Sequence, residues 1–246
     1  MKVLILAAGR GERLRPFTDS IPKPLLQVGG RPLIEHLIAD LARAGFCDIV
    51  INLAHLGGKS QDRLGDGRRF GITIAYSQEG GEALETGGGI HRALPLLGNE
   101  PFLVVNGDVA SDFPFENLQR HPDGLAHLVL VENPPHHPQG DFALQGDRVV
   151  DEGEPKYTFS GIGVYRPELF AGRKPGKFPL APLLREAMVG GSVSGQIHTG
   201  FWMDIGTVER LRELDERLTA LSVKPGALGN FQRTQLLSLA EAIHDQ

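Results

Sequence analysis

The chain has 246 residues, of which 41% are hydrophobic and 22% are charged, as in soluble globular proteins with one full core. The net charge of −5 excludes a broadly basic surface for nucleic acid, and the single cysteine, Cys47, excludes a disulfide framework within the chain. The opening apolar run is too short for a signal peptide, and no stretch reaches the roughly 20 apolar residues of a membrane span. We therefore expect a cytoplasmic protein without nucleic-acid or membrane partners, and a Cys47 thiol in or near the core.

The first predicted element is a strand at residues 1–8, MKVLILAA, which leads directly into the loop GRGERLRP at residues 9–16. Glycines let backbone N–H groups close on an anion and arginines neutralise it, so this junction predicts a phosphate site. Two better-known phosphate loops are absent. The dinucleotide pattern G-x-G-x-x-G has Leu14 at its third glycine, and G-x-x-x-x-G-K-[ST] is missing. Prolines at positions 16, 22 and 24 also oppose a long helix directly behind the loop.

The next part of the chain alternates between strand and helix patterns. Pro32 suits the first turn of an amphipathic helix and Gly45 suits its carboxyl end. Such alternation predicts a parallel sheet with right-handed crossovers and helices on both faces. The predicted elements are a helix at 32–45, a strand at 48–53, a weaker helix at 59–64, a strand at 72–76, a glycine-rich loop and helix over 79–97, and a buried strand within 101–108.

From residue 124 onward, short strand patterns follow one another with few helices between them, which predicts a mixed-sheet extension over the ligand cleft. A final amphipathic pattern at 231–243 favours a helix that docks on its own domain or on another subunit, so a homo-oligomer stays open. The predicted elements are strands at 125–131, 141–144, 148–150 and 157–165, a helix at 180–188, two strands within 193–202, and helices at 208–221 and 231–243.

The first loop resembles the start of the sugar-1-phosphate nucleotidyltransferases, whose pattern is roughly G-x-G-x-R-[LM]-x-P-x-T followed by P-K-P. Nine residues carry it in order: Gly9, Gly11, Arg13, Leu14, Pro16, Thr18, Pro22, Lys23 and Pro24. The resemblance implies an α/β fold that is Rossmann-like, with a mostly parallel central sheet, helices on both faces and a mixed-sheet sugar-binding extension, as in GT-A-like nucleotidyltransferases. We expect this domain to span residues 1–222, with a linker and helix at 223–246.

The resemblance implies a nucleotide site with Arg13 and Lys23 as catalytic residues. Its other members are Ala8, Gly9, Gly11, Glu12, Glu79, Thr86 and Gly87. A carboxylate only accepts hydrogen bonds, so Glu79 suits a base edge with an N–H group, as in uracil, thymine or guanine, better than cytosine. The alternative is that the glutamates near position 79 form a solvated acidic loop.

Two aspartates are predicted to bind Mg²⁺. Asp108 follows a strand buried on both faces, and ligands of open α/β sheets gather at such carboxyl ends. Asp204 lies in the string WMDIGT, which matches the family's second metal aspartate in W-x-D-[IV]-G-T. Mg²⁺ bound with substrate phosphates needs only one or two protein carboxylates. The alternative for Asp204 is a cap at the start of the following helix.

The resemblance places sugar recognition in the mixed-sheet extension. The implied contacts are Asn106, Gly140, Asp141, Glu152, Ser160 and Gly161. His136 and His137 precede Asp141 and raise the alternative of a zinc site. Adjacent histidines in a proline-rich loop point to different sides and lack a third ligand at a suitable spacing, so we expect a solvent-exposed loop instead.

The expected reaction is magnesium-dependent transfer of a nucleotidyl group from a nucleoside triphosphate to a sugar 1-phosphate, without a covalent enzyme intermediate. Within the family, strings such as VNGD, FSGI and LAPLLR are similar to the branch that uses UTP and N-acetylmuramate 1-phosphate in cell-wall recycling. Mannose-1-phosphate guanylyltransferases are the alternative branch. A non-catalytic sensor of nucleotide sugars is a further alternative, disfavoured because both cations and both aspartates are present.

Overall fold

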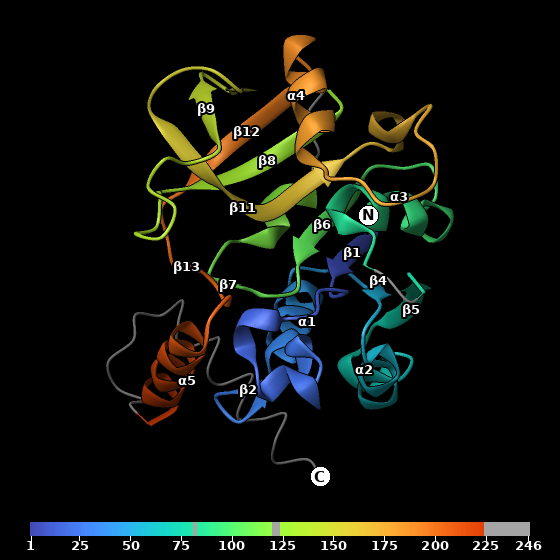
Figure 1. Ribbon diagram of the computed structural model, residues 1–246, viewed down its shortest axis with the longest axis vertical. Coiled ribbons are helices and arrows are strands. Elements are labelled where there is room, and N and C mark those ends of the chain that lie inside the picture. Colours follow the sequence, from blue (N-terminus) through green and yellow to red (C-terminus); the bar gives the residue numbers. More distant parts are fainter. Residues whose placement is uncertain (81–82, 120–123, 224–246) are drawn as a thin grey trace.

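The computed structural model describes residues 1–80, 83–119 and 124–223. In that part of the chain one mixed sheet runs in the order β5-β4-β1-β6-β11-β8-β12-β10-β9 (Figure 1). Its strands are β1 (Val3–Leu6), β4 (Asp48–Leu53), β5 (Thr73–Gln78), β6 (Phe102–Asn106), β8 (Ala126–Val131), β9 (Phe142–Gln145), β10 (Arg148–Val150), β11 (Lys156–Tyr165) and β12 (Val193–His198).

Two small ladders and five α-helices complete the described fold. The ladders pair β2 (Gln27–Val28) with β3 (Arg31–Pro32), and β7 (Val109–Ser111) with β13 (Trp202–Asp204). The helices are α1 (Leu33–Arg43), α2 (Gly57–Leu64), α3 (Glu85–Leu97), α4 (Ala181–Val189) and α5 (Val208–Val223). Short 3₁₀ turns are η1 (Glu12–Leu14), η2 (Phe17–Asp19), η3 (Lys23–Leu25), η4 (Arg68–Phe70), η5 (Phe115–Gln119) and η6 (Pro167–Phe170).

Strands β5, β4, β1 and β6 are all parallel and are called the parallel half below. Successive residues of β1 point to opposite faces, so Val3 and Ile5 join one buried cluster with α1 and α2, while Leu4 joins another with α3 and α4. Apolar runs without alternation are typical of strands covered on both faces. The predicted alternation of strands and helices, with helices on both faces, is confirmed.

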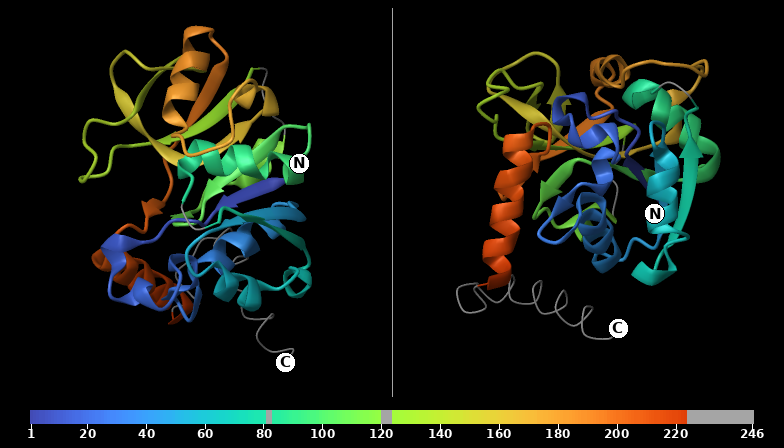
Figure 2. Two further views of the ribbon diagram at one scale, coloured as in Figure 1. Left: turned by 45° about the vertical axis from the view of Figure 1, so that its right-hand side comes forward. Right: turned by 60° about the horizontal axis from the view of Figure 1, so that its bottom comes forward.

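The remaining sheet strands, β11, β8, β12, β10 and β9, are called the extension. Strand β11 is antiparallel to both β6 and β8, whereas β12 is parallel to β8. Strand β9 pairs with β10 and also with the start of β11. In Figures 1 and 2 the extension and α4 form one lobe, and the parallel half with α1 and α2 forms the other. The predicted mixed sheet is therefore observed.

Helix α5 returns from the extension to the lobe that contains the parallel half (Figure 2). Its Leu214 is buried with Val28 of β2 and with Ile205, which follows β13. The amide of Gly29 also donates to the Asp215 carboxylate (2.7 Å). These contacts join a late helix to the loops that follow β1.

Several details differ from the predictions. Cys47 is exposed, not in the core, because Phe46 takes the buried position before β4 begins. The two small ladders were not predicted, since strands of two or three residues carry no periodic signal. The predicted helix at 231–243 lies outside the described residues. None of the described helices has the length and apolar content needed to cross a bilayer.

Candidate functional site

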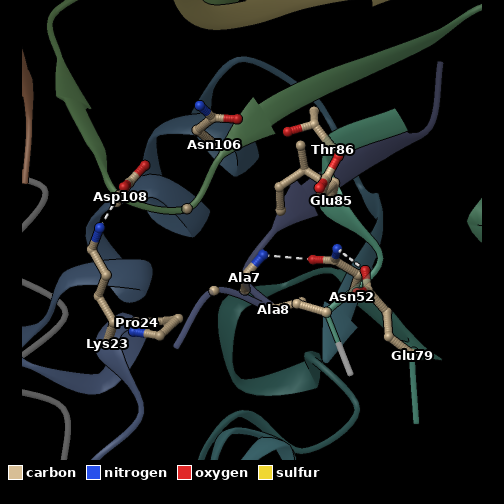
Figure 3. A pocket seen from close by; sticks show the side chains of 14 residues that line it. Ala7, Ala8, Lys23, Pro24, Asn52, Glu79, Glu85, Thr86, Asn106 and Asp108 are labelled. Atoms are coloured by element: carbon tan, nitrogen blue, oxygen red, sulfur yellow. Dashed lines mark hydrogen bonds and ion pairs between the residues drawn. The ribbon is translucent and has the colours of Figure 1, made fainter. Parts of the chain in front are cut away.

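An open pocket lies where the four strands of the parallel half reach their carboxyl ends (Figure 3). It encloses about 720 Å³ of space, which includes open solvent at its mouth. The predicted site residues that line it are Ala8, Gly9, Lys23, Glu79, Thr86, Asn106 and Asp108. They come from segments as far apart in the chain as residues 8 and 108, and the topology brings them together as expected for such a sheet.

The end of β1, where the glycine-rich loop at residues 9–16 begins, lies very close to the end of β6. The Gly107 amide donates to the Leu6 carbonyl (2.8 Å), and a Cβ built on Gly107 would lie 2.9 Å from that oxygen. Only glycine fits there without a shift of the backbone. This contact fixes the start of the loop next to Asp108.

A buried hydrogen-bond chain that sequence reasoning missed crosses the pocket floor. The Ala7 amide donates to Asn52 Oδ1 (2.5 Å), and Asn52 Nδ2 donates to Glu79 Oε1 (2.6 Å; Figure 3). Glu79 Oε2 in turn accepts from the Leu84 amide (2.8 Å). Both Asn52 and Glu79 are buried, so these hydrogen bonds hold the end of β1 and the loop before α3 together. Asn52 is the second-to-last residue of β4, which pairs with β1, and that position is the signal that could have found it.

The backbone segments that carry the two predicted metal aspartates are hydrogen-bonded to each other, although the two positions are 96 apart in the sequence. Asp204 pairs with Val109 in the β13–β7 ladder, and the Ile205 amide donates to the Asp108 carbonyl (2.7 Å). Lys23 forms an ion pair with Asp108 Oδ2, and the Lys23 side chain is only 13% exposed. Among the described residues no cluster of three or more His, Cys, Asp and Glu side chains could hold a metal. A metal here would therefore need substrate oxygens besides the two carboxylates.

The remaining predicted nucleotide residues lie outside the pocket lining. Gly11 has a φ of +66°, and its carbonyl accepts from the Thr18 hydroxyl (2.8 Å). Arg13 lies against Gly206, since a Cβ built there would be 3.0 Å from Arg13 Nη2. Glu12 is exposed in η1. Gly87 faces Phe178 of the loop before α4, because a Cβ at Gly87 would lie 2.6 Å from that ring.

A bulge in β11 places two of the predicted sugar residues. The pairing of β11 with β8 shifts between Phe159 and Ile162, so Ser160 and Gly161 are extra residues. The buried Ser160 hydroxyl donates to the Val129 carbonyl (2.7 Å) and accepts from the Ile162 amide (3.2 Å). Ser160 thus uses its hydroxyl inside the sheet.

The bulge also connects the extension to the pocket. Gly161 has a φ of +79°, and a Cβ there would lie 2.5 Å from Asn106 Nδ2. Asn106 points into the pocket in Figure 3. The Ser160 carbonyl accepts from Trp202 Nε1 (2.9 Å), which ties the bulge to β13.

The other predicted sugar residues lie on the extension, away from the described pocket lining. Asp141 Oδ2 accepts from the Phe159 amide (2.8 Å), and His137 Nε2 lies 3.2 Å from Asp141 Oδ1. Gly140 has a φ of +64° at the turn before Asp141. Glu152 is exposed between β10 and β11.

The histidine pair divides between two partners. His136 Nε2 lies 3.1 Å from Asp204 Oδ1, whereas His137 contacts Asp141. The loop is exposed, as predicted, but it also reaches Asp204, the second aspartate predicted to bind metal, and sequence reasoning missed this contact.

A family model described as nucleotidyl transferase matches residues 2–144, which hold every residue that lines the pocket. The chain belongs to the nucleotidyl transferase family. A Neisseria meningitidis protein named N-acetylmuramate alpha-1-phosphate uridylyltransferase is 55% identical over 87% of this chain and 96% of its own length. A Caulobacter vibrioides protein of the same name is 32% identical, with the same two coverages. The resemblance stated for the first loop is confirmed.

Solved structures agree on the fold. A Bacillus anthracis protein assigned as a glucose-1-phosphate thymidylyltransferase, crystallised with sucrose, superposes with a TM-score of 0.78 at 25% identity. That match covers 95% of this chain and 99% of the other. The inositol-1-phosphate CTP transferase of T. maritima has a TM-score of 0.71 at 18% identity, over 93% and 98% of the two chains. Nucleotidyltransferases thus share this α/β arrangement of a mixed sheet with helices.

Proposed function

We propose that the protein joins UTP and N-acetylmuramate 1-phosphate to give UDP-N-acetylmuramate and pyrophosphate. The observation that carries the proposal is that Lys23 pairs with Asp108 at the pocket, next to the segment that carries Asp204, in a nucleotidyl transferase fold. The names of two relatives, 55% and 32% identical, supply the donor and acceptor. We further propose that this activity belongs to peptidoglycan recycling in the cytoplasm.

In this proposal the pocket holds the uridine. Ala8, Gly9, Thr86 and Glu79 line it. Each carboxylate oxygen of Glu79 already accepts one hydrogen bond, from Asn52 and from the Leu84 amide. A carboxylate has about four acceptor positions, so Glu79 retains room for the N3–H group of uracil. Its fixed orientation would select a base that presents a donor.

The transfer needs positioning and charge neutralisation more than covalent chemistry. An oxygen of the sugar phosphate attacks the α-phosphorus, a new P–O bond forms, and the bond to the β-phosphate breaks with release of pyrophosphate. Lys23 would bind the α-phosphate and the incoming phosphate. Amides at Gly9 and Gly11, together with Arg13, would bind the leaving phosphates, with Glu12 at the edge of that loop.

Mg²⁺ fits the two aspartates in donor chemistry. Carboxylate oxygens are its preferred protein ligands, and Asp108 and Asp204 lie on neighbouring segments that are hydrogen-bonded to each other. Both carboxylates already have cationic partners, Lys23 and Arg210, in keeping with a place for positive charge. When bound, the ion would neutralise and orient phosphate oxygens.

The extension is proposed to hold the sugar. Asn106 and Gly161 lie at its junction with the pocket, and Ser160 would position them from inside the bulge. Gly140, Asp141 and Glu152 would line the outer part of the sugar site. We further propose that residues 1–222 form this Rossmann-like transferase domain and that 223–246 is an appendage.

The test is pyrophosphate release from a panel of UTP, GTP, dTTP and CTP with several sugar 1-phosphates. We expect measurable turnover only with UTP and N-acetylmuramate 1-phosphate, and competitive inhibition by UDP-N-acetylmuramate. A preference for GTP with mannose 1-phosphate would contradict the uridylyl assignment and favour the other branch, to which proteins of Xenopus laevis named mannose-1-phosphate guanyltransferase are 30% and 31% identical matches.

A further inference from the structure

Asp204 contacts one basic group nearby in the chain and one from a distant loop. Arg210 Nη1, in the first turn of α5, lies 2.6 Å from Asp204 Oδ1. His136 Nε2, from the loop between β8 and β9, lies 3.1 Å from the same oxygen. The Arg210 and Asp204 side chains are 15% and 25% exposed, so the pair is partly withdrawn from solvent.

A second arginine, Arg13, lies close to this pair. A Cβ built on Gly206 would lie 2.5 Å from Arg210 Nη2 and 3.0 Å from Arg13 Nη2. Both guanidinium groups therefore pack against the same glycine, which tolerates them because it has no side chain. Two permanent positive charges share this place with one carboxylate, and the excess charge suits phosphate oxygens.

A metal ion on Asp204 Oδ1 would compete with Arg210 for the negative charge of that oxygen. Mg²⁺ binds oxygen at about 2.0–2.1 Å, and its charge would repel a guanidinium group on the same oxygen. Metal binding would therefore weaken the ion pair between Arg210 and Asp204. Arg13 lies next to Arg210, so two guanidinium groups would then be close enough to bind one anion.

We propose that Arg210 is a positioning residue of the transfer. It holds Asp204 while no metal is bound, and on metal binding it joins Arg13 in binding a substrate phosphate. The inference rests on the proposed function only in taking Asp204 as a metal ligand and phosphate as the anion. Metal and phosphate binding then favour each other, since each removes the competitor of the other.

The same logic applies to Lys23 and Asp108, and the two pairs flank one another. Lys23 contacts Asp108 as Arg210 contacts Asp204, and the Ile205 amide joins the two segments. Each carboxylate is thus neutralised before a metal arrives. Arg210 differs in that its guanidinium has a fork of donors, which suits two phosphate oxygens together.

The experiment measures binding of Mn²⁺ alone, and of pyrophosphate with Mn²⁺, by calorimetry on the full chain. For Arg210→Gln we expect Mn²⁺ alone to bind about tenfold more tightly and pyrophosphate about tenfold more weakly than in wild type. Arg212→Gln removes the same charge from an exposed position of α5 and should change neither value. Fluorescence of Trp202, the one tryptophan of the sequence, reports whether β13 keeps its environment.

A second variant keeps the test decisive if Arg210→Gln does not fold. Arg210→Lys retains the charge without the fork, so Mn²⁺ alone should bind as in wild type while pyrophosphate binds more weakly. Unchanged or weaker Mn²⁺ binding in Arg210→Gln, or wild-type pyrophosphate binding in Arg210→Lys, would overturn the proposal. Neither measurement uses a sugar or a base, so failure of the substrate panel alone would contradict only the proposed function.

Discussion

In the parallel half, pocket residues such as Gly9, Glu79 and Asp108 lie just after strand ends, whereas in the extension a bulge and side-chain hydrogen bonds place the predicted sugar residues. Asp108 follows β6 within two residues, and its position is set by backbone pairing. Gly161 faces Asn106 only because β11 carries two extra residues. The first arrangement should tolerate changes in the surrounding side chains, and the second should depend on particular residues.

The largest effect is expected from removing either carboxylate at the meeting point of the two regions. Asp108→Asn and Asp204→Asn should each lower kcat by a hundredfold or more, because each loses about 3 kcal/mol of charge stabilisation in the transition state. The double variant should lose little more than either single one, as groups that act as a unit are not additive. Asp147→Asn, at an exposed position of the extension, is the matched control. Near-normal turnover of either single variant would show that the aspartate changed in it has no part in the reaction.

The bulge offers the sharpest test of the extension. Gly161→Ala should lower the free energy of unfolding by about 2–4 kcal/mol, through left-handed backbone strain and a clash with Asn106. Gly146→Ala has a similar φ of +63° but open space around it, so it should show the strain alone. Urea unfolding measures both, and the KM for the sugar phosphate should rise only in Gly161→Ala. Equal effects in the two variants would show that the contact with Asn106 has no influence.

The hydrogen-bond chain under the pocket tests the parallel half. Asn52→Ala leaves the Ala7 amide without its acceptor and removes one donor from Glu79, so we expect a loss of about 2 kcal/mol in the free energy of unfolding. The KM for the nucleotide should rise as the two loops separate. Asn99→Ala, an exposed position after α3, should stay within about 0.5 kcal/mol of wild type. A wild-type nucleotide KM in Asn52→Ala would contradict the coupling of the loops.

The smallest effect concerns pH and α1. Burial lowers the pKa of His36, whose Nε2 lies 2.8 Å from the Val28 carbonyl and whose Nδ1 lies 3.1 Å from Arg31 Nη2. Below its usual pKa of about 6.5 the unfolded chain binds the proton first, so stability falls as the pH drops. Burial raises the pKa of Asp40 to about 6, which acts in the opposite direction.

A comparison of variants therefore isolates the histidine. Between about pH 7.5 and about pH 5.5, wild type should lose more free energy of unfolding than His36→Gln. Urea titrations at the two pH values give the difference. Equal losses in both proteins would show that His36 titrates alike in the folded and unfolded chains.

Periodicity in the sequence was sufficient for the regular elements. Strand β4 is found at the predicted residues 48–53. The predicted helix end at Gly45 is confirmed, because the Gly45 amide donates a hydrogen bond to the Ala42 carbonyl (3.0 Å) and Gly45 has a φ of +86°. Such local signals depend on neighbours within one turn or one strand. They do not specify the sheet order, which is set by contacts between distant segments.

Local patterns also could not show which side chains meet. Asn52 lies in an apolar strand and gave no motif, and Arg210 was one of many charges on an amphipathic helix. Ser160 and Gly161 were expected to act alike, but the bulge turns the serine hydroxyl inward and the glycine toward Asn106. Each of these differences arises from long-range packing.

The β13–β7 ladder has a consequence for biosynthesis. A chain leaving the ribosome can pair β1, β4 and β6 once residue 106 is free, because these strands need nothing later. Asp204 joins Asp108 only after nearly twice as much polypeptide has been translated. A truncated translation product that ends before β13 would thus contain every residue that lines the pocket but only one of the two aspartates proposed to bind metal.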